Sequence, residues 1–212
     1  MAKRRRNIAG LLISLLFAVS AGAFSAAPAM DAASRLMQNQ MITNTLTSLS
    51  KVDQTRIQEE IEKSIKYNEL VYQDQQMGKY GYLGSSATDD TYDSLWQFDS
   101  AGTICTIDIP TVNIKLPVLH GTNSNDLQYA AGHMYGSSIP VGGENTKAVI
   151  AAHTGLASAS LFTDLDRMQM GDEFFIHIGA TVHAYTVTDI AIAPKGEEKE
   201  ELKISKAKYK IK

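Results

Sequence analysis

The chain has 212 residues, of which 44% are hydrophobic and one is a cysteine, and its formal net charge is −3. One cysteine can form neither an intramolecular disulfide nor a cysteine-based zinc cluster, so disulfide-stabilised scaffolds and zinc fingers are excluded. The nearly balanced charge gives no electrostatic reason to expect nucleic acid as a partner. The length and hydrophobic content are enough for one domain with a buried core and an appendage.

Residues 1–30 have the pattern of an export or membrane segment. A basic cluster at residues 3–6 precedes an uncharged stretch that runs to Met30. This pattern fits a cleaved signal peptide, with small-residue sites at 21–23 and 27–29, and it equally fits an uncleaved membrane anchor. Both interpretations stay open. Both predict that the rest of the chain lies outside the cytoplasm, because a basic flank stays on the cytoplasmic side.

Residues 31–72 predict an N-terminal helical extension outside the main core. Five apolar residues recur near the spacing of one helix face: Leu46, Leu49, Ile57, Ile61 and Ile65. This spacing indicates one or two amphipathic helices. Residues 73–101 lose the periodicity and gain Gly, Ser and Asp, which predicts a linker or lid-like loop.

Residues 102–212 predict a mainly β fold, a largely antiparallel barrel or sandwich, because short β-branched runs alternate with Gly, Pro and Asn. The expected strands span 103–109, 114–118, 148–152, 173–178 and 181–193. Short helical pieces are expected near 125–130 and 161–167, and a hairpin turn is expected within 177–182. Alternation at 208–212 could begin a further strand.

His153 is the candidate catalytic residue. It follows the apolar run Ala148–Ala152 and precedes Thr154 and Gly155, so its imidazole can exchange protons with a substrate at the rim of a sheet. A capping or core histidine is the alternative. The chain's five histidines match no helical His-x-x-x-His spacing, so neither a metal site nor a cofactor is expected. We expect Cys105, within an alternating strand, to be a buried core residue.

Several further motifs occur in order between residues 92 and 205. They are Ile107-Asp-Ile-Pro110, Leu116-Pro-Val118, His120-Gly-Thr122, Gly132 to Gly143, His153-Thr-Gly-Leu156, Leu161-Phe-Thr-Asp-Leu-Asp166, Met170-Gly-Asp-Glu-Phe174 and Ala184-Tyr-Thr-Val187. Together they resemble the sortases, cysteine transpeptidases of Gram-positive surfaces, and in particular the pilin-polymerising class C. The resemblance implies a sortase-like antiparallel β-barrel at the extracytoplasmic face of the cell membrane, held there through the N-terminus.

The resemblance also implies a chemistry. Sortases cleave a sorting signal of the Leu-Pro-x-Thr-Gly type on a surface protein or pilin. A cysteine thiolate forms a thioacyl intermediate, which an amine such as a pilin lysine or a cell-wall peptide then resolves. His153 matches the family histidine, which donates and accepts protons.

The nucleophilic cysteine and the oxyanion-binding arginine of the family have no counterpart in these 212 residues. The family places both late in the chain, yet no cysteine follows His153, and Arg167, the only arginine after Arg56, does not match in position. We therefore expect a barrel truncated before its last strands, without transpeptidase activity as given. The alternatives are a non-catalytic relative that binds a surface protein or sorting peptide, and a membrane-anchored structural β-domain of the cell envelope. A Thr-Leu-x-Thr-Cys motif encoded in another frame beyond codon 212 would establish truncation of an ordinary sortase.

Overall fold

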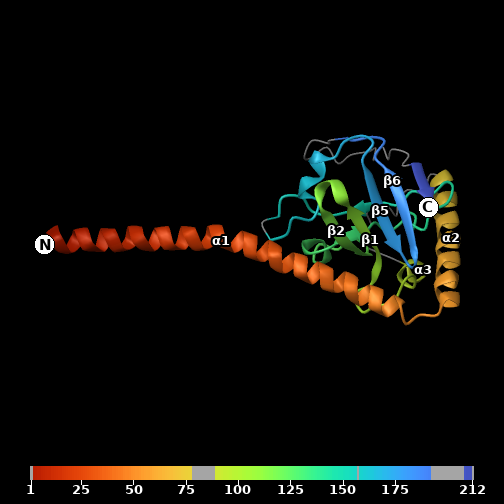
Figure 1. The fold of residues 1–212 in the computed structure, drawn as a ribbon, viewed down its shortest axis with the longest axis horizontal. Helices are drawn as coiled ribbons and strands as arrows, with labels where there is room; N and C mark the ends of the chain where they lie inside the picture. The colour runs from red at the N-terminus through yellow and green to blue at the C-terminus, as the bar shows by residue number, and fades with distance from the viewer. Residues whose placement is uncertain (1, 78–88, 157, 192–207, 212) are drawn as a thin grey trace.

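The computed structural model describes residues 2–77, 89–156, 158–191 and 208–211, with side chains described for 26–77, 89–156 and 158–191. The helices are α1 (Ala2–Leu49), α2 (Gln54–Gln76) and α3 (Asp90–Asp93). Short 3₁₀ turns follow β1, β2 and β4 at Pro110–Val112, Asp126–Gln128 and Thr163–Arg167. The strands are β1 (Thr103–Ile109), β2 (Ile114–His120), β3 (Ala131–His133), β4 (Ile150–Ala151), β5 (Glu173–Ile178), β6 (Thr181–Thr186) and β7 (Lys208–Ile211). Figure 1 shows the two long helices leading into the strands.

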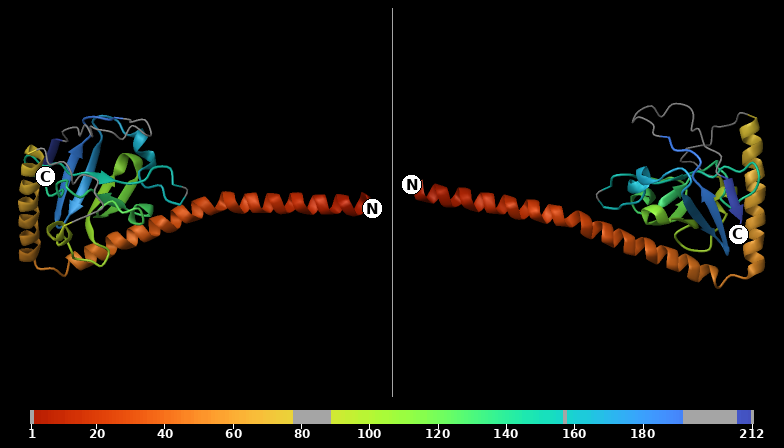
Figure 2. Two further views of the ribbon diagram at one scale, coloured as in Figure 1. Left: turned by 180° about the vertical axis from the view of Figure 1, so that it is seen from behind. Right: turned by 45° about the horizontal axis from the view of Figure 1, so that its top comes forward.

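The strands form a single sheet in the order β4-β3-β2-β1-β5-β6-β7. All neighbours are antiparallel except β2 and β3, which run parallel. Within the described residues no pairing joins β4 to β7, so these two strands are the edges of an open, curled sheet (Figures 1 and 2). The expectation of a mainly β, largely antiparallel fold is confirmed.

Local patterns predicted several elements with their bounds. Strands 103–109 and 173–178 are β1 and β5, and the hairpin between β5 and β6 turns at Gly179, whose φ of +56° suits a residue without a Cβ. The strand expected over 181–193 ends at Thr186. Beyond it, Val187 exchanges backbone hydrogen bonds with Gly171 and Asp172, at 2.8 Å each, and so pairs with the turn before β5.

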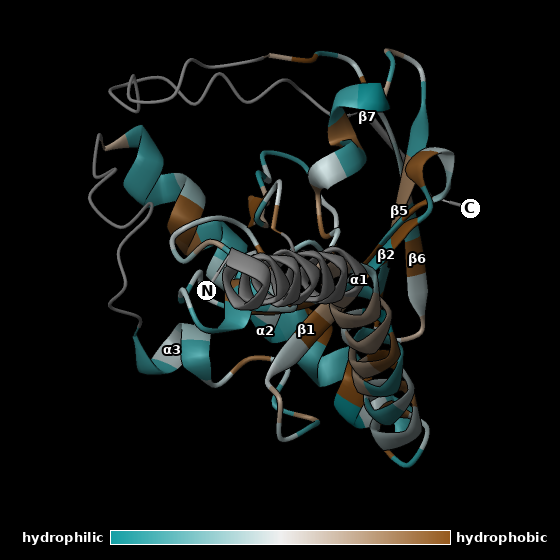
Figure 3. Ribbon diagram, turned by 90° about the vertical axis from the view of Figure 1, so that its left-hand side faces the viewer, coloured by the Kyte–Doolittle hydropathy of each residue, from teal (hydrophilic) through white to brown (hydrophobic). Residues whose placement is uncertain are grey.

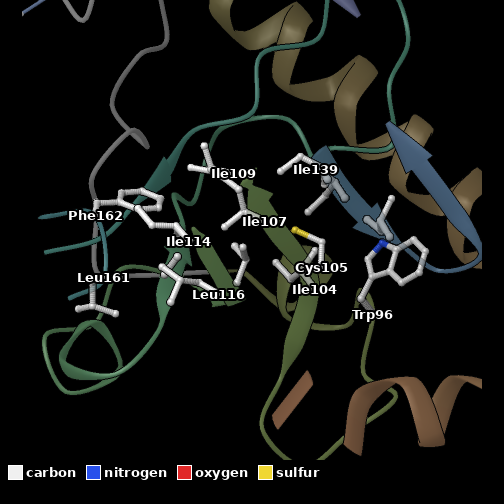
Figure 4. Packing of buried hydrophobic residues seen from close by; sticks show 14 of the residues in the cluster. Trp96, Ile104, Cys105, Ile107, Ile109, Ile114, Leu116, Ile139, Leu161 and Phe162 are labelled. Carbon is white, nitrogen blue, oxygen red and sulfur yellow. The ribbon is translucent and has the colours of Figure 1, made fainter. Parts of the chain in front are cut away.

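The hydrophobic core lies against β1, β2 and β5. Its members include Ile107, Leu116 and Ile176, which are 5%, 3% and 2% exposed. Ile107 stands opposite Leu116 on β2 and Ile176 on β5, so apolar side chains meet at the same level of the sheet. Figure 4 shows this packing and the sulfur of Cys105 within it.

Helix α2 belongs to this core, and the expectation that it lies outside is wrong. The amide and indole nitrogens of Trp96 donate to Glu60 Oε1 at 3.0 Å and Ser64 Oγ at 2.8 Å. Asn68 exchanges two hydrogen bonds with the backbone of Ile139, at 2.9 and 2.7 Å. The helix faces the domain with apolar residues, such as Tyr67 and Val71, and also with polar residues four apart that satisfy buried partners, which the apolar spacing does not indicate.

The predicted linker over 73–101 is also different in the structure. Helix α2 continues to Gln76, and residues 78–88 lie outside the described residues. The part from Asp89 onwards contributes three side chains to the core, because Tyr92, Leu95 and Trp96 are 0%, 2% and 1% exposed. Asp89 caps α3 by accepting from the Tyr92 amide at 2.8 Å, which starts this segment in a defined place.

Helix α1 meets the domain through a mostly polar stripe. The residues turned toward the domain recur at three- and four-residue spacing and are Asp31, Ser34, Gln38, Met41, Ile42 and Thr45. Leu46, expected on the buried face, is 56% exposed. In Figure 3 hydrophilic and hydrophobic residues both follow the described part of this helix. The placement of α1 against the domain therefore depends on hydrogen bonds more than on the burial of apolar side chains.

None of the helices in the described portion is sufficiently long and apolar to pass through a membrane. The expected signal or anchor at 1–30 stays a prediction.

Candidate active site

His153 stands at an edge of the sheet. It follows β4 by two residues, and β4 pairs with β3 so that Ile150 lies opposite His133. Its side chain is partly exposed, and its imidazole makes no hydrogen bond to any residue the structure describes. An imidazole placed in this way can exchange protons with a bound molecule.

The backbone around His153 forms a closed loop. The amide of Phe162 donates to the His153 carbonyl at 3.1 Å, and the amide of Thr163 donates to Ser160 at 2.7 Å. The Gly155 amide donates to Thr163 Oγ1 at 3.0 Å. Loop 153–163, as we call this segment, is therefore held at both of its ends although it has little regular structure.

Part of this loop is strained. Leu161 has a φ of 36°, a backbone conformation that residues other than glycine rarely adopt. Its side chain is only 2% exposed. Phe162 next to it is also buried, and Figure 4 shows both side chains beside Ile114 and Leu116. Burial of these two residues holds the loop in a conformation that it would not adopt alone.

Cys105 is a buried thiol of the core. It is 3% exposed in β1, and burial raises the pKa of its thiol well above the ordinary value. A neutral, buried thiol is a poor nucleophile. Strands β2 and β3 lie between β1, which carries Cys105, and β4, which precedes His153. At a strand spacing of about 4.8 Å, β1 and β4 are roughly 14 Å apart along the sheet. The expectation that Cys105 is a core residue is confirmed.

His133 has a structural role. Its Nδ1 lies 2.9 Å from Tyr92 Oη and its Nε2 lies 2.9 Å from the Ser138 carbonyl, which accepts from Nε2–H. Complete burial lowers the pKa of His133 to about 4, so the ring is neutral at pH 7. His120 is held similarly, since its Nε2 lies 2.7 Å from the Leu95 carbonyl and burial lowers its pKa. Hydrogen bonds therefore hold both rings in place at the ends of β2 and β3.

The remaining charged candidates face solvent or other strands. Arg167 is exposed and lies 3.9 Å from Asp164 within the same 3₁₀ turn. His177 on β5 lies 3.9 Å from Asp108 on β1. Among the described residues, no group of three or more His, Cys, Asp or Glu side chains is arranged to hold a metal ion.

Two residues near the site have no counterpart in the sequence prediction. Asp31 and Arg35 of α1 contact Ser160 in loop 153–163, across 129 and 125 positions of the chain. The only sequence signal was a possible ion pair at i, i+4 on a helix, which says nothing about a distant third partner.

Comparisons with known proteins find sortases. A family profile described as Sortase domain matches residues 107–208. Sortase A of Streptococcus agalactiae serotype III (strain NEM316) is 35% identical over 88 residues, which are 40% of this chain and 35% of that protein. The chain thus spans about a third of that relative's length.

Solved structures extend the similarity to the helices and the sheet together. Sortase C1 of Streptococcus agalactiae is 31% identical, with a TM-score of 0.63 over 71% of this chain and 76% of that chain. Sortase C of Streptococcus pneumoniae is 30% identical, with a TM-score of 0.59 over 75% of this chain and 79% of that chain.

Proposed function

The chain belongs to the sortase family and is of the class C type, and from this premise we propose that His153 is the residue that donates and accepts protons in sorting-signal transpeptidation. The observation that supports the proposal is the placement of His153 at the end of β4, on a closed loop, with an imidazole that bonds to no described residue. The proposed substrates are surface proteins or pilins with a Leu-Pro-x-Thr-Gly-type signal. The crystal structure of the similar S. pneumoniae sortase C is described as giving insights into pilin substrate specificity.

In the proposed reaction a thiolate attacks the carbonyl carbon of the threonine in the signal. The Thr–Gly bond breaks, the glycine amine leaves with a proton from the imidazolium of His153, and the threonine stays bound as a thioester. An incoming amine, from a pilin lysine or a cell-wall peptide, then gives a proton to His153 as it attacks the thioester, and the thiolate is released. The setting is the extracytoplasmic face of a Gram-positive-type envelope, with residues 1–30 as export signal or anchor.

We propose that the 212 residues on their own supply no thiolate and therefore bind a sorting signal without cleaving it. Cys105 is the chain's single thiol and is buried with a raised pKa. Incubation with a Leu-Pro-x-Thr-Gly peptide and an amine should give no product by chromatography and no mass adduct. A thioacyl adduct on Cys105 would contradict this proposal.

A chimera tests the role of His153 by turnover. The chain would be joined, after β6, to the C-terminal segment of S. agalactiae sortase C1, which supplies the family's late cysteine and arginine. We expect His153→Ala to lower turnover in this chimera about 10²- to 10⁴-fold, the usual contribution of a general acid or base.

His177→Ala is the matched control, because His177 is also a partly exposed histidine on the sheet and pairs with Asp108 instead. It should leave turnover nearly unchanged. If the two variants are equally active, His153 is not the proton-transfer residue.

A second candidate function is a non-catalytic envelope domain that binds surface proteins or has a structural role. The burial of the single thiol favours it. Measured affinity of the 212-residue chain for a sorting-signal peptide supports binding, whereas no affinity together with a folded, monodisperse chain supports the structural role.

A further inference from the structure

Helix α1 is hydrogen-bonded to loop 153–163 at Ser160. Asp31 Oδ1 accepts from the Ser160 amide at 2.7 Å and from Ser160 Oγ at 2.8 Å. Arg35 Nη2 donates to the same Oγ at 3.1 Å, and Arg35 Nε donates to Asp31 Oδ2 at 2.9 Å. Both oxygens of the carboxylate are therefore used, and Arg35 fixes the orientation in which Asp31 meets Ser160. Hydrogen bonds to an ionised group are stronger than those between neutral groups.

The ionisation of Asp31 agrees with this geometry. Partial burial alone would raise the pKa of its carboxyl, but the hydrogen bonds from Ser160 and the neighbouring Arg35 outweigh it and the pKa is lowered. The carboxylate is therefore charged at neutral pH.

Ser160 is closely linked to His153. The Phe162 amide bonds to the His153 carbonyl at 3.1 Å, and the Thr163 amide bonds to the Ser160 carbonyl at 2.7 Å. Ala159 and Leu161, on either side of Ser160, are 1% and 2% exposed. A displacement of Ser160 therefore cannot be absorbed by its neighbours and must reach the segment whose amide holds the His153 backbone.

Asp31 is itself anchored, because α1 docks at two further places. Gln38 Nε2 donates to the Tyr129 carbonyl at 3.0 Å, and Gln38 is buried. About one turn further on Ile42 is buried, and about two turns further on Thr45 donates to Asp99. The helix thus presents Asp31 from a fixed support.

We propose that Asp31 is a positioning residue for His153: by holding Ser160, it keeps loop 153–163 and the imidazole in place for a sorting signal. This proposal rests on the proposed function only in giving His153 its chemical role. It makes the helix that follows the N-terminal segment part of the site's support, although α1 carries none of the reacting groups.

The test compares Asp31→Ala with Thr43→Val in the full chain by NMR. Two readouts are followed: hydrogen exchange of the Phe162 amide, and the chemical shifts of the His153 imidazole. In Asp31→Ala we expect at least tenfold faster exchange at Phe162 and shifted His153 signals, with exchange at Ile107 in β1 unchanged. Asp31→Asn retains an acceptor for Ser160 and should fall between Asp31→Ala and the unaltered chain.

Thr43→Val is the matched control, because Thr43 is an exposed residue of the same helix whose hydroxyl donates to the Asn39 carbonyl within α1. It should leave Phe162 and His153 as in the unaltered chain. The proposal is overturned if Asp31→Ala changes neither readout, if Phe162 and Ile107 accelerate equally, or if Thr43→Val has the same effect as Asp31→Ala. These readouts need no peptide and no turnover, so a failure of the chimera experiment is distinguishable from a failure here.

Discussion

Asn68 offers a direct measure of how far α2 is part of the domain. Its side chain is 3% exposed and makes two hydrogen bonds to Ile139, which is 0% exposed, through Nδ2 to the carbonyl at 2.9 Å and Oδ1 from the amide at 2.7 Å. Asn68→Ala leaves a buried amide and a buried carbonyl without partners. Each such group costs about 1–3 kcal/mol, so we expect the free energy of unfolding to fall by about 3 kcal/mol.

Urea unfolding followed by circular dichroism measures this change. For an m-value of about 2 kcal/mol/M, a loss of about 3 kcal/mol lowers the midpoint by roughly 1.5 M, with the slope unchanged because the same surface is exposed on unfolding. Glu69→Ala, at the next, exposed position of the same helix, is the control and should stay within about 0.5 kcal/mol. Equal midpoints for the two variants would refute the reasoning, because α2 would then not be docked through Asn68.

Three further predictions concern groups buried in the sheet. The thiol of Cys105 should react with a thiol reagent in urea but be protected without it, and fast labelling of the folded chain would mean that β1 is open there. The pKa of His133 is lowered to about 4, whereas an unfolded histidine titrates near 6.5, so the unfolded state takes up the proton first as the pH falls. The free energy of unfolding should therefore fall by roughly 3 kcal/mol as the pH is lowered from about 6.5 to 4. Urea unfolding at several pH values should show a smaller fall for His133→Gln than for the unaltered chain. An equal fall in both would contradict the lowered pKa of His133. A Cβ at Gly132 would lie 2.2 Å from the Gly121 carbonyl oxygen, so Gly132→Ala should lower the free energy of unfolding by about 3 kcal/mol or more in thermal unfolding. At Gly155 a Cβ has open space but φ is +73°, so Gly155→Ala should lower it by about 1–2 kcal/mol. Equal melting temperatures for the two variants would show that the contact at Gly132 relaxes freely.

The elements predicted best were those that neighbouring residues define. Alternation over 103–109 and 173–178 located β1 and β5, and Gly179 marked the turn of the β5–β6 hairpin. Strand β3 was missed because Ala131–His133 has only three residues and no periodic pattern. It forms a strand because it pairs in parallel with β2 and because the His133 ring bonds to Tyr92 and Ser138.

The candidate site divides in the same way. His153 was predicted from its position after an apolar run and from the motifs around it, and the structure places it on a closed loop at an edge of the sheet. The support of that loop was not predictable, because Asp31 and Ser160 are 129 residues apart and neither belongs to a local pattern that names the other.

By itself the sequence determined the class of fold, the order of the family motifs, the candidate histidine and the core character of Cys105, since these depend on residue type and on spacing over a few positions. Only the tertiary structure decided that one face of α2 is buried, that Trp96 lies in the core and that α1 reaches the histidine loop. These depend on which polar groups find partners once distant segments exclude water, and the spacing of residues along the chain does not name those partners.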